Sequence, residues 1–178
     1  MQMDITLPRF TILIHTVGPG FARQSEPVMH QVAAGPVHWD WLFQRSVNQR
    51  GGAGVWTWAT DPLPWLAEQL SGSTASAAAS GAPVTTPALR LADHRLRYLD
   101  FEGDIGKGRG SVRQLMTGHY ELKQQTDRCF EAVLRWSNPQ AGGSGGAVAG
   151  GAAEVRFSAT ERDELGAATW WDATVVGH

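Results

Sequence analysis

Hydrophobic and polar residues alternate along much of the chain, and this period of two predicts β-strands rather than helices. The clearest case is the segment 37–43, VHWDWLF, whose aromatic residues occupy every second position. In a strand these aromatic side chains share one face, which we expect to pack into a core. The opposite face then carries His38, Asp40 and Leu42, so an imidazole and a carboxylate lie together on one side of the strand.

Other short segments show the same alternation or are rich in aromatic and β-branched residues. They predict strands over residues 9–15, 55–60, 111–116, 119–124, 128–136, 155–158 and 169–176. The strands at 37–43 and 55–60 are expected to form an antiparallel hairpin. Residues 61–70, with prolines near their start, predict a short helix, and residues 161–165 predict a turn or a helical piece. The fold is therefore predicted to be mainly β, a small antiparallel β-barrel (or sandwich) with short helices.

Segments rich in glycine, proline and small residues separate the predicted strands. Residues 16–36 contain three glycine or proline turn signals and indicate a long inserted loop. Residues 71–88 and 138–153 have low-complexity compositions and indicate two flexible loops. No internal repeat divides the sequence, so residues 1–178 are predicted to form a single domain.

The segment 88–112 mixes a histidine, a tyrosine, acids and bases in an order that core packing does not explain. Within it, Gly106, Gly108 and Gly110 indicate a tight turn that leads into the strand at 111–116. Because no GKT or GKS sequence follows these glycines, a nucleotide-binding P-loop is not predicted.

Composition excludes several classes of protein. The 178 residues carry 15 lysines and arginines against 17 acidic residues, a net charge of −2, so nucleic-acid binding would depend on a local patch. The single cysteine, Cys129, excludes an intrachain disulfide and a cysteine zinc cluster and favours a cytoplasmic protein. No apolar run is long enough to span a bilayer, and we expect no membrane association.

Candidate chemistry centres on two histidines and one aspartate. His38 and Asp40 share a strand face, and His15 ends the first predicted strand, where a ligand is often held. Two neutral imidazoles and a carboxylate are a usual ligand set for manganese, iron or zinc. From the residues alone, a structural interpretation stays open: His15 could cap its strand, and His38 and Asp40 could pair on a hydrated face.

The order of several motifs resembles a known family. FTILIH, VHWDWLF, TWA and ADHRLRYLDFEG, followed by a glycine turn and a GHYEL segment, resemble the 3′-phosphoesterase module of bacterial DNA ligase D. The stand-alone "DNA polymerase ligase N-terminal-like" proteins look closest. The resemblance covers roughly residues 9–60 and 88–124, a little over half of the chain. It implies a small antiparallel barrel that removes a 3′-phosphate or a 3′-terminal ribonucleotide from DNA ends during end-joining repair.

The resemblance also implies a role for individual residues. His15, His38 and Asp40 match the family's metal ligands, with Mn²⁺ as the preferred ion and Zn²⁺ or another divalent metal as the alternative. His94 and Tyr98 match the pair that holds the phosphate and assists catalysis.

Phosphate binding is where the chain departs from the family motif. The family usually has an arginine two residues after the aspartate, and this chain has Leu42 there. We expect Arg95, Arg97 or Arg109 to replace it, because guanidinium groups fit phosphate geometry.

The partners implied by the resemblance are DNA 3′ ends and, through them, a repair ligase or polymerase, and we expect a monomer.

Two alternatives remain open. One is a weakly active or inactive accessory module that binds DNA ends, suggested by Leu42. The other is a non-haem iron oxygenase that would use His38, Asp40 and His94, without His15, as a facial triad.

Overall fold

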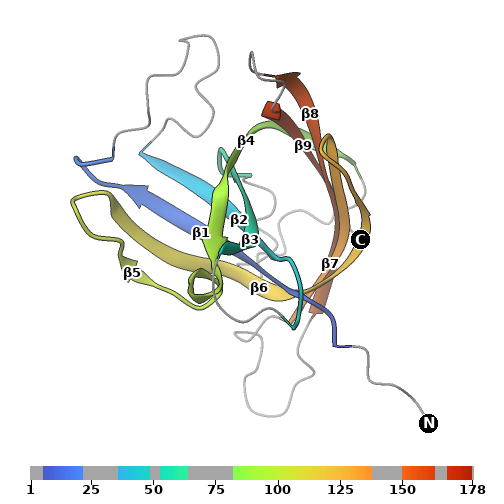
Figure 1. Ribbon diagram of the computed structural model, residues 1–178, viewed down its shortest axis with the longest axis horizontal. Helices are drawn as coiled ribbons and strands as arrows, with labels where there is room; N and C mark the ends of the chain where they lie inside the picture. Colours follow the sequence, from blue (N-terminus) through green and yellow to red (C-terminus); the bar gives the residue numbers. More distant parts are fainter. Residues whose placement is uncertain are drawn as a thin grey trace.

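Strands dominate the parts of the chain that the structure describes (Figure 1). This structure is a computed structural model, and it describes residues 6–21, 36–48, 53–63, 82–137, 150–162 and 168–177. In chain order, the elements are β1 (Arg9–Val17), β2 (Val37–Gln44), β3 (Ala53–Thr60), β4 (Val84–Arg95), the 3-10 helix η2 (Leu96–Leu99), β5 (Gly103–Asp104), β6 (Gly110–Gln125), β7 (Cys129–Ser137), β8 (Gly150–Arg162) and β9 (Ala168–Gly177). The predicted mainly-β class is therefore confirmed.

Eight of these strands form a closed antiparallel barrel. Their order is β1-β2-β3-β4-β9-β8-β7-β6, and the pairing of β6 with β1 completes the ring, while the short β5 adds to the start of β6. The predicted hairpin of β2 and β3 is present, with Trp41 opposite Trp58. Barrel closure leaves neither β1 nor β6 as a free edge.

The barrel interior is filled by side chains that point inward from all eight strands. At this strand number the interior is just wide enough for side chains to fill it. Phe43 lies near the centre, and its ring contacts the rings of Phe10, Trp58, Tyr120, Phe130 and Phe157. The aromatic face predicted for residues 37–43 is therefore the face that lines this core.

A second apolar cluster covers part of the barrel's outer surface. It consists of Leu13, Leu42, Val55, Leu99 and Val112, all buried. The helix η2 holds it against the wall, because the carbonyl oxygen of Leu99 accepts a hydrogen bond of 2.9 Å from the Thr11 hydroxyl. Both faces of β1 and β2 are therefore buried, one in the barrel and one beneath the segment that follows β4.

Several predicted boundaries are wrong, for identifiable reasons. Residues 111–116 and 119–124 belong to one strand, β6, which runs through the turn expected at 117–118. Gly118 does not mark a turn: a Cβ there would collide with the carbonyl oxygen of Arg135, so the glycine allows two strands to approach closely.

The expected loops at 71–88 and 138–153 each end in a strand. β4 already begins at Val84, where β-branched residues pair with β9. β8 begins at Gly150, and the ring of Trp136 lies where a side chain of Gly151 would be, so small residues there reflect packing. The remainder of both segments lies outside the described residues.

The inserted loop predicted at 16–36 overlaps β1, which extends to Val17, and residues 22–35 lie outside the described part. Most of the helix predicted at 61–70 lies outside it as well. Of the piece predicted at 161–165, the first two residues belong to β8. No helix within the described residues is long and apolar enough to cross a membrane.

Replacing Phe43 with alanine should destabilise the protein by about 3–5 kcal/mol, because it removes the ring that contacts five other rings. Urea denaturation followed by tryptophan fluorescence measures the change. Leu122→Ala is the control, because Leu122 is 42% exposed and its loss should change stability by less than about 0.5 kcal/mol. Equal effects of the two substitutions would contradict the position of the core.

Candidate metal centre

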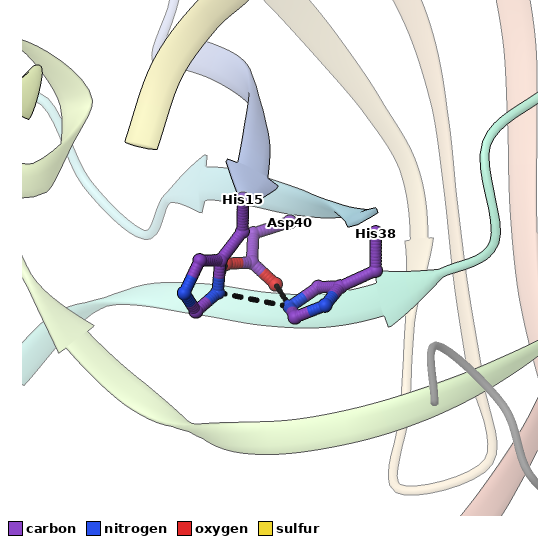
Figure 2. Close-up of side chains that lie close together, drawn as sticks. All are labelled: His15, His38 and Asp40. Atoms are coloured by element: carbon purple, nitrogen blue, oxygen red, sulfur yellow. Dashed lines mark hydrogen bonds and ion pairs between the residues drawn. The ribbon is translucent and has the colours of Figure 1, made fainter. Parts of the chain in front are cut away.

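Three polar side chains converge on the outside of the barrel wall, where β1 ends and β2 begins (Figure 2). His15 is the direct cross-strand partner of His38. Asp40 lies two residues further along β2 on the same face, because Trp39 beside it points into the barrel core. The alternation of β2 therefore separates the aromatic core from this polar cluster.

The donor atoms of the three residues have spacings that suit a single ion. His15 Nδ1 lies 3.0 Å from His38 Nε2 and 3.6 Å from Asp40 Oδ2. His38 Nε2 lies 3.4 Å from Asp40 Oδ1. Ligands bound at about 2.1 Å are about 3.0 Å apart in an octahedron and about 3.4 Å apart in a tetrahedron. The residues present therefore fit a divalent transition metal, and they are the only such group of three among the described residues.

The orientation of His15 is fixed by a backbone carbonyl. Its Nε2 lies 3.1 Å from the carbonyl oxygen of Arg109, and since a carbonyl only accepts, Nε2 carries the hydrogen. In the neutral imidazole this leaves the Nδ1 lone pair facing the cluster. Metal-bound histidines in proteins are usually held by such a hydrogen bond from the second ring nitrogen.

Two glycine-containing segments bring Arg109 to this position. The Arg109 carbonyl also accepts the backbone N–H of Gly18 at 3.1 Å, and Gly20 donates to the Gly108 carbonyl at 2.7 Å. A Cβ on Gly18 or Gly20 would collide with the backbone of residues 107–108. Gly110 has a φ of 109°, and a Cβ there would collide with the carbonyl oxygen of Thr16. The glycines therefore permit the backbone contact that holds His15.

The cluster is almost completely buried. His15, His38 and Asp40 are 4%, 1% and 7% exposed, so the hydrated-face interpretation of His38 and Asp40 is wrong. The ring of Phe21 covers both imidazoles, with centroid distances of 5.1 Å to His15 and 5.7 Å to His38.

Burial does not neutralise the aspartate. Burial raises the pKa of Asp40, but its close contacts with the two imidazoles outweigh this effect and lower the pKa to about 2. Asp40 is therefore ionised at neutral pH, as a metal ligand must be.

Two atoms of the cluster have no hydrogen-bond partner within the described residues: Asp40 Oδ1 and His38 Nδ1. Asp40 Oδ1 is near His38 Nε2 but not in hydrogen-bond geometry. A buried carboxylate oxygen without a donor is costly, and a cation would satisfy it.

His94 and Tyr98 lie together but away from this cluster. Their rings are in edge contact at 5.3 Å, and His94 Nδ1 lies 2.9 Å from the carbonyl oxygen of Ala92. His94 pairs with Val55, which itself pairs with Gln44 at the far end of β2. At about 3.3 Å per residue, Gln44 is roughly 20 Å along the strand from His38. The three side chains that the oxygenase hypothesis needs are therefore not brought together. The structure likewise does not place His94 and Tyr98 beside the cluster, where the predicted role of holding the phosphate would need them.

The position of Leu42 leaves no place for a phosphate-binding group. Its side chain is fully buried in the outer apolar cluster. Of the three arginines predicted to compensate, Arg97 stacks on Tyr98, and Arg95 is exposed at the end of β4. Only Arg109 belongs to the glycine loop that contacts His15, and its guanidinium donates to the carbonyl oxygens of Ile105 and Gly106.

Fold and cluster together define a closed antiparallel β-barrel protein with a candidate two-histidine, one-carboxylate metal site on the outside of its wall. No protein-family model matches the chain, and no curated protein matches it. The likeness to the DNA ligase D phosphoesterase module is therefore carried by the sequence motifs alone.

Sequence reasoning did not find the groups that surround the cluster. Phe21 and the Arg109 carbonyl have no sequence signal, since a carbonyl is common to every residue. The glycines around positions 18 and 108 are visible in the sequence as turns. Their contact with each other is visible only in the structure.

The protein should bind one divalent ion per chain, measured by calorimetric titration with Zn²⁺ and Mn²⁺. Asp40→Asn and His15→Gln should each weaken binding by more than about 10-fold, because each removes a donor from the cluster. His119→Ala, an exposed histidine on β6, is the matched control and should bind as the wild type does. Unchanged binding in Asp40→Asn and His15→Gln would show that the ion binds elsewhere.

Gly110→Ala should weaken metal affinity by about 10- to 100-fold, because the new Cβ pushes the glycine loop, and with it the Arg109 carbonyl, away from His15. Gly103→Ala is the matched control: Gly103 has a similar φ of 117°, but a Cβ there meets nothing within 4 Å. Both variants should lose stability through backbone strain. If both also lose metal affinity equally, strain rather than loop position explains the loss.

Proposed function

We propose that this protein is a metal-dependent phosphoesterase that acts on the 3′ ends of nucleic acids. The observation that carries the proposal is the convergence of His15, His38 and Asp40, three positions that the family motif assigns as ligands, at spacings that fit one ion. Mn²⁺ is the ion that the resemblance favours, and the nitrogen and oxygen donors also suit Zn²⁺.

A divalent ion held by these residues would polarise a phosphoryl oxygen and activate water for attack. The residues themselves fix where that happens. His15 is oriented by the Arg109 carbonyl, and Asp40 stays ionised, so the cluster keeps its metal-binding form at neutral pH. The ring of Phe21 packs against both imidazoles.

Arg109 is the best candidate for binding the phosphate. The Arg109 carbonyl oxygen accepts a hydrogen bond from His15, so the loop that carries the guanidinium contacts the metal site directly. The Arg109 side chain is exposed. Its guanidinium donates hydrogen bonds to the carbonyl oxygens of Ile105 and Gly106, and its remaining N–H groups can donate to a phosphate oxygen. Lys107, exposed at the tip of the same loop, adds a second positive charge.

His94 and Tyr98 are proposed to contact the nucleic-acid strand at a distance from the reacting phosphate. They lie on the outer face of the barrel, the face that also carries the metal cluster, since Tyr98 packs on the outer apolar cluster and His94 pairs with Val55 of that cluster. Arg97 stacks on the Tyr98 ring and adds a cation there. These residues form a polar and aromatic surface of the kind that binds single strands.

The second candidate function is a DNA-end-binding module without turnover. Leu42 favours it, because the position that carries an arginine in the family is enclosed here by apolar side chains. The two candidates share the surface and the partners, namely nucleic-acid 3′ ends and a repair ligase or polymerase. They differ in catalysis alone.

Purified protein with Mn²⁺ should release phosphate from a 3′-phosphorylated primer–template, and Asp40→Asn should abolish the release while leaving the fold intact.

Arg109→Ala should raise KM by about 10-fold through loss of a charged hydrogen bond, whereas Arg113→Ala, an exposed arginine of β6, should not. His94→Ala and Tyr98→Phe should raise KM with little change in kcat.

Phosphate release that persists in Asp40→Asn would disprove the assignment of the site. Saturable binding of the primer–template without any phosphate or nucleoside release, in Mn²⁺ and in Zn²⁺, would favour the end-binding module.

A further inference from the structure

Three basic side chains form a row across the outer face of the barrel. Arg9 of β1 is the direct cross-strand partner of His119 of β6, and His119 is in turn the partner of Arg135 of β7. On each strand a residue directly adjacent in sequence belongs to the interior core, so these three side chains point outward. We call Arg9, His119 and Arg135 the basic row.

An open hollow of about 450 Å³ lies beside the basic row. Its lining residues are Thr6, Leu7, His119, Arg135, Trp136 and Ser137. The lining residues therefore carry a guanidinium, an imidazole and two hydroxyls, all of which can donate hydrogen bonds. Arginine and hydroxyl side chains of this kind make most of the side-chain contacts to phosphate oxygens in protein–DNA complexes.

His119 and Arg135 can both reach a ligand. Both residues are exposed, and neither side chain forms a hydrogen bond or an ion pair with another residue in the described part of the chain. On its other side Arg135 faces Ala152 of β8, whose small side chain leaves the guanidinium open. Arg9 differs from them, because its guanidinium donates to the carboxylate of Asp100.

The balance of charge around the basic row is positive, although the whole chain has a net charge of −2. Asp100 is bound to Arg9, and the carboxylate of Glu121 accepts a hydrogen bond from Lys123. That hydrogen bond is the main reason why the pKa of Glu121 is lowered, and the charge of Arg135 adds to the effect. Basic side chains placed directly opposite one another repel, and a polyanion would relieve this repulsion.

The basic row lies at a defined distance from the metal cluster, on the same outer face. Arg9 precedes His15 on β1 by a distance of about 20 Å, at about 3.3 Å per residue. The surface that carries Arg97 and Tyr98 adjoins the row, because Asp100 directly follows η2 and binds Arg9. A stacked strand rises about 3.4 Å per nucleotide, so a strand that reaches the metal cluster would pass the row about six nucleotides away.

We propose that the basic row binds backbone phosphates of a nucleic acid, about five to seven nucleotides from the 3′ end that the metal cluster holds. The proposal rests on the proposed function, which places the 3′ end at the metal cluster. Arg135 and His119 donate to phosphate oxygens, and Arg9 adds positive charge while it stays bound to Asp100. Such contacts position the strand without reading its sequence.

Fluorescence anisotropy with a labelled primer–template of about 12 base pairs tests this contact, and a 3′-hydroxyl end keeps binding separate from turnover. We expect Arg135→Ala to lower the affinity about 10-fold and to reduce the slope of log K against log salt by about one, because one phosphate contact is lost. His119→Ala should lower the affinity less. Arg156→Ala is the matched control and should bind as the wild type does, because this exposed arginine of β8 is paired with Glu131.

Uncharged methylphosphonate groups in both strands locate the contact. Placed about five to seven nucleotides from the 3′ end, they should weaken binding to the wild type about as much as Arg135→Ala does. In Arg135→Ala they should add little further loss, because the partner of these phosphates is already missing. At the opposite end of the duplex they should leave the affinity unchanged.

Inorganic phosphate distinguishes a backbone phosphate from a free anion, and it should displace the duplex only at concentrations far above the Kd of the duplex. Displacement by inorganic phosphate near that Kd, an equal loss in Arg156→Ala, or additive losses from Arg135→Ala and the methylphosphonates would each overturn the proposal. If these binding losses occur but the wild type releases no phosphate, only the catalytic assignment fails. If phosphate is released but Arg135→Ala binds as the wild type does, only the basic row fails.

Discussion

The antiparallel pairing of β1 with β6 is the contact on which the rest of the structure depends. It closes the ring of eight strands, and it also continues past the core to the end of β1, where His15 lies opposite Val112. The same register places Thr16 and Val17 beside Ser111 and Gly110, directly after the glycine loop. One ladder of backbone hydrogen bonds therefore both encloses the aromatic interior and brings the loop to the outer polar cluster.

The cluster illustrates how a barrel wall can hold charge in a buried place. Asp40 is removed from water but remains ionised because two imidazoles face it. This arrangement is poor as a purely structural device, since buried polar atoms without partners destabilise a fold. The imidazoles and the carboxylate of this cluster are costly to bury and converge on one point, and a bound ligand explains such an arrangement better than packing does.

The sequence predicts the strands that have strong alternation, and with them the face of β2 that enters the core. The convergence of His15, His38 and Asp40 was also predicted, from the alternation that places His38 and Asp40 on one strand face and from the resemblance of the motif order to a known family. Strand positions built from small residues were not predictable: β8 begins in a glycine-rich stretch whose composition resembles a linker, and only the overlying Trp136 explains it. The separation of His94 from the cluster depends on the register of β2, β3 and β4, which no local pattern encodes.

The alternation of β2 has a consequence for how this chain can change over time. Trp39 and Trp41 face inward while His38 and Asp40 face outward. Core packing and the polar cluster therefore both depend on the same alternation of side chains along the strand. A single-residue insertion or deletion between positions 37 and 44, unless a β-bulge absorbed it, would reverse the facing of the residues on one side of it and so turn outward-facing polar residues inward or inward-facing indoles outward. A change of length in this strand is therefore far more costly than a substitution at a fixed position.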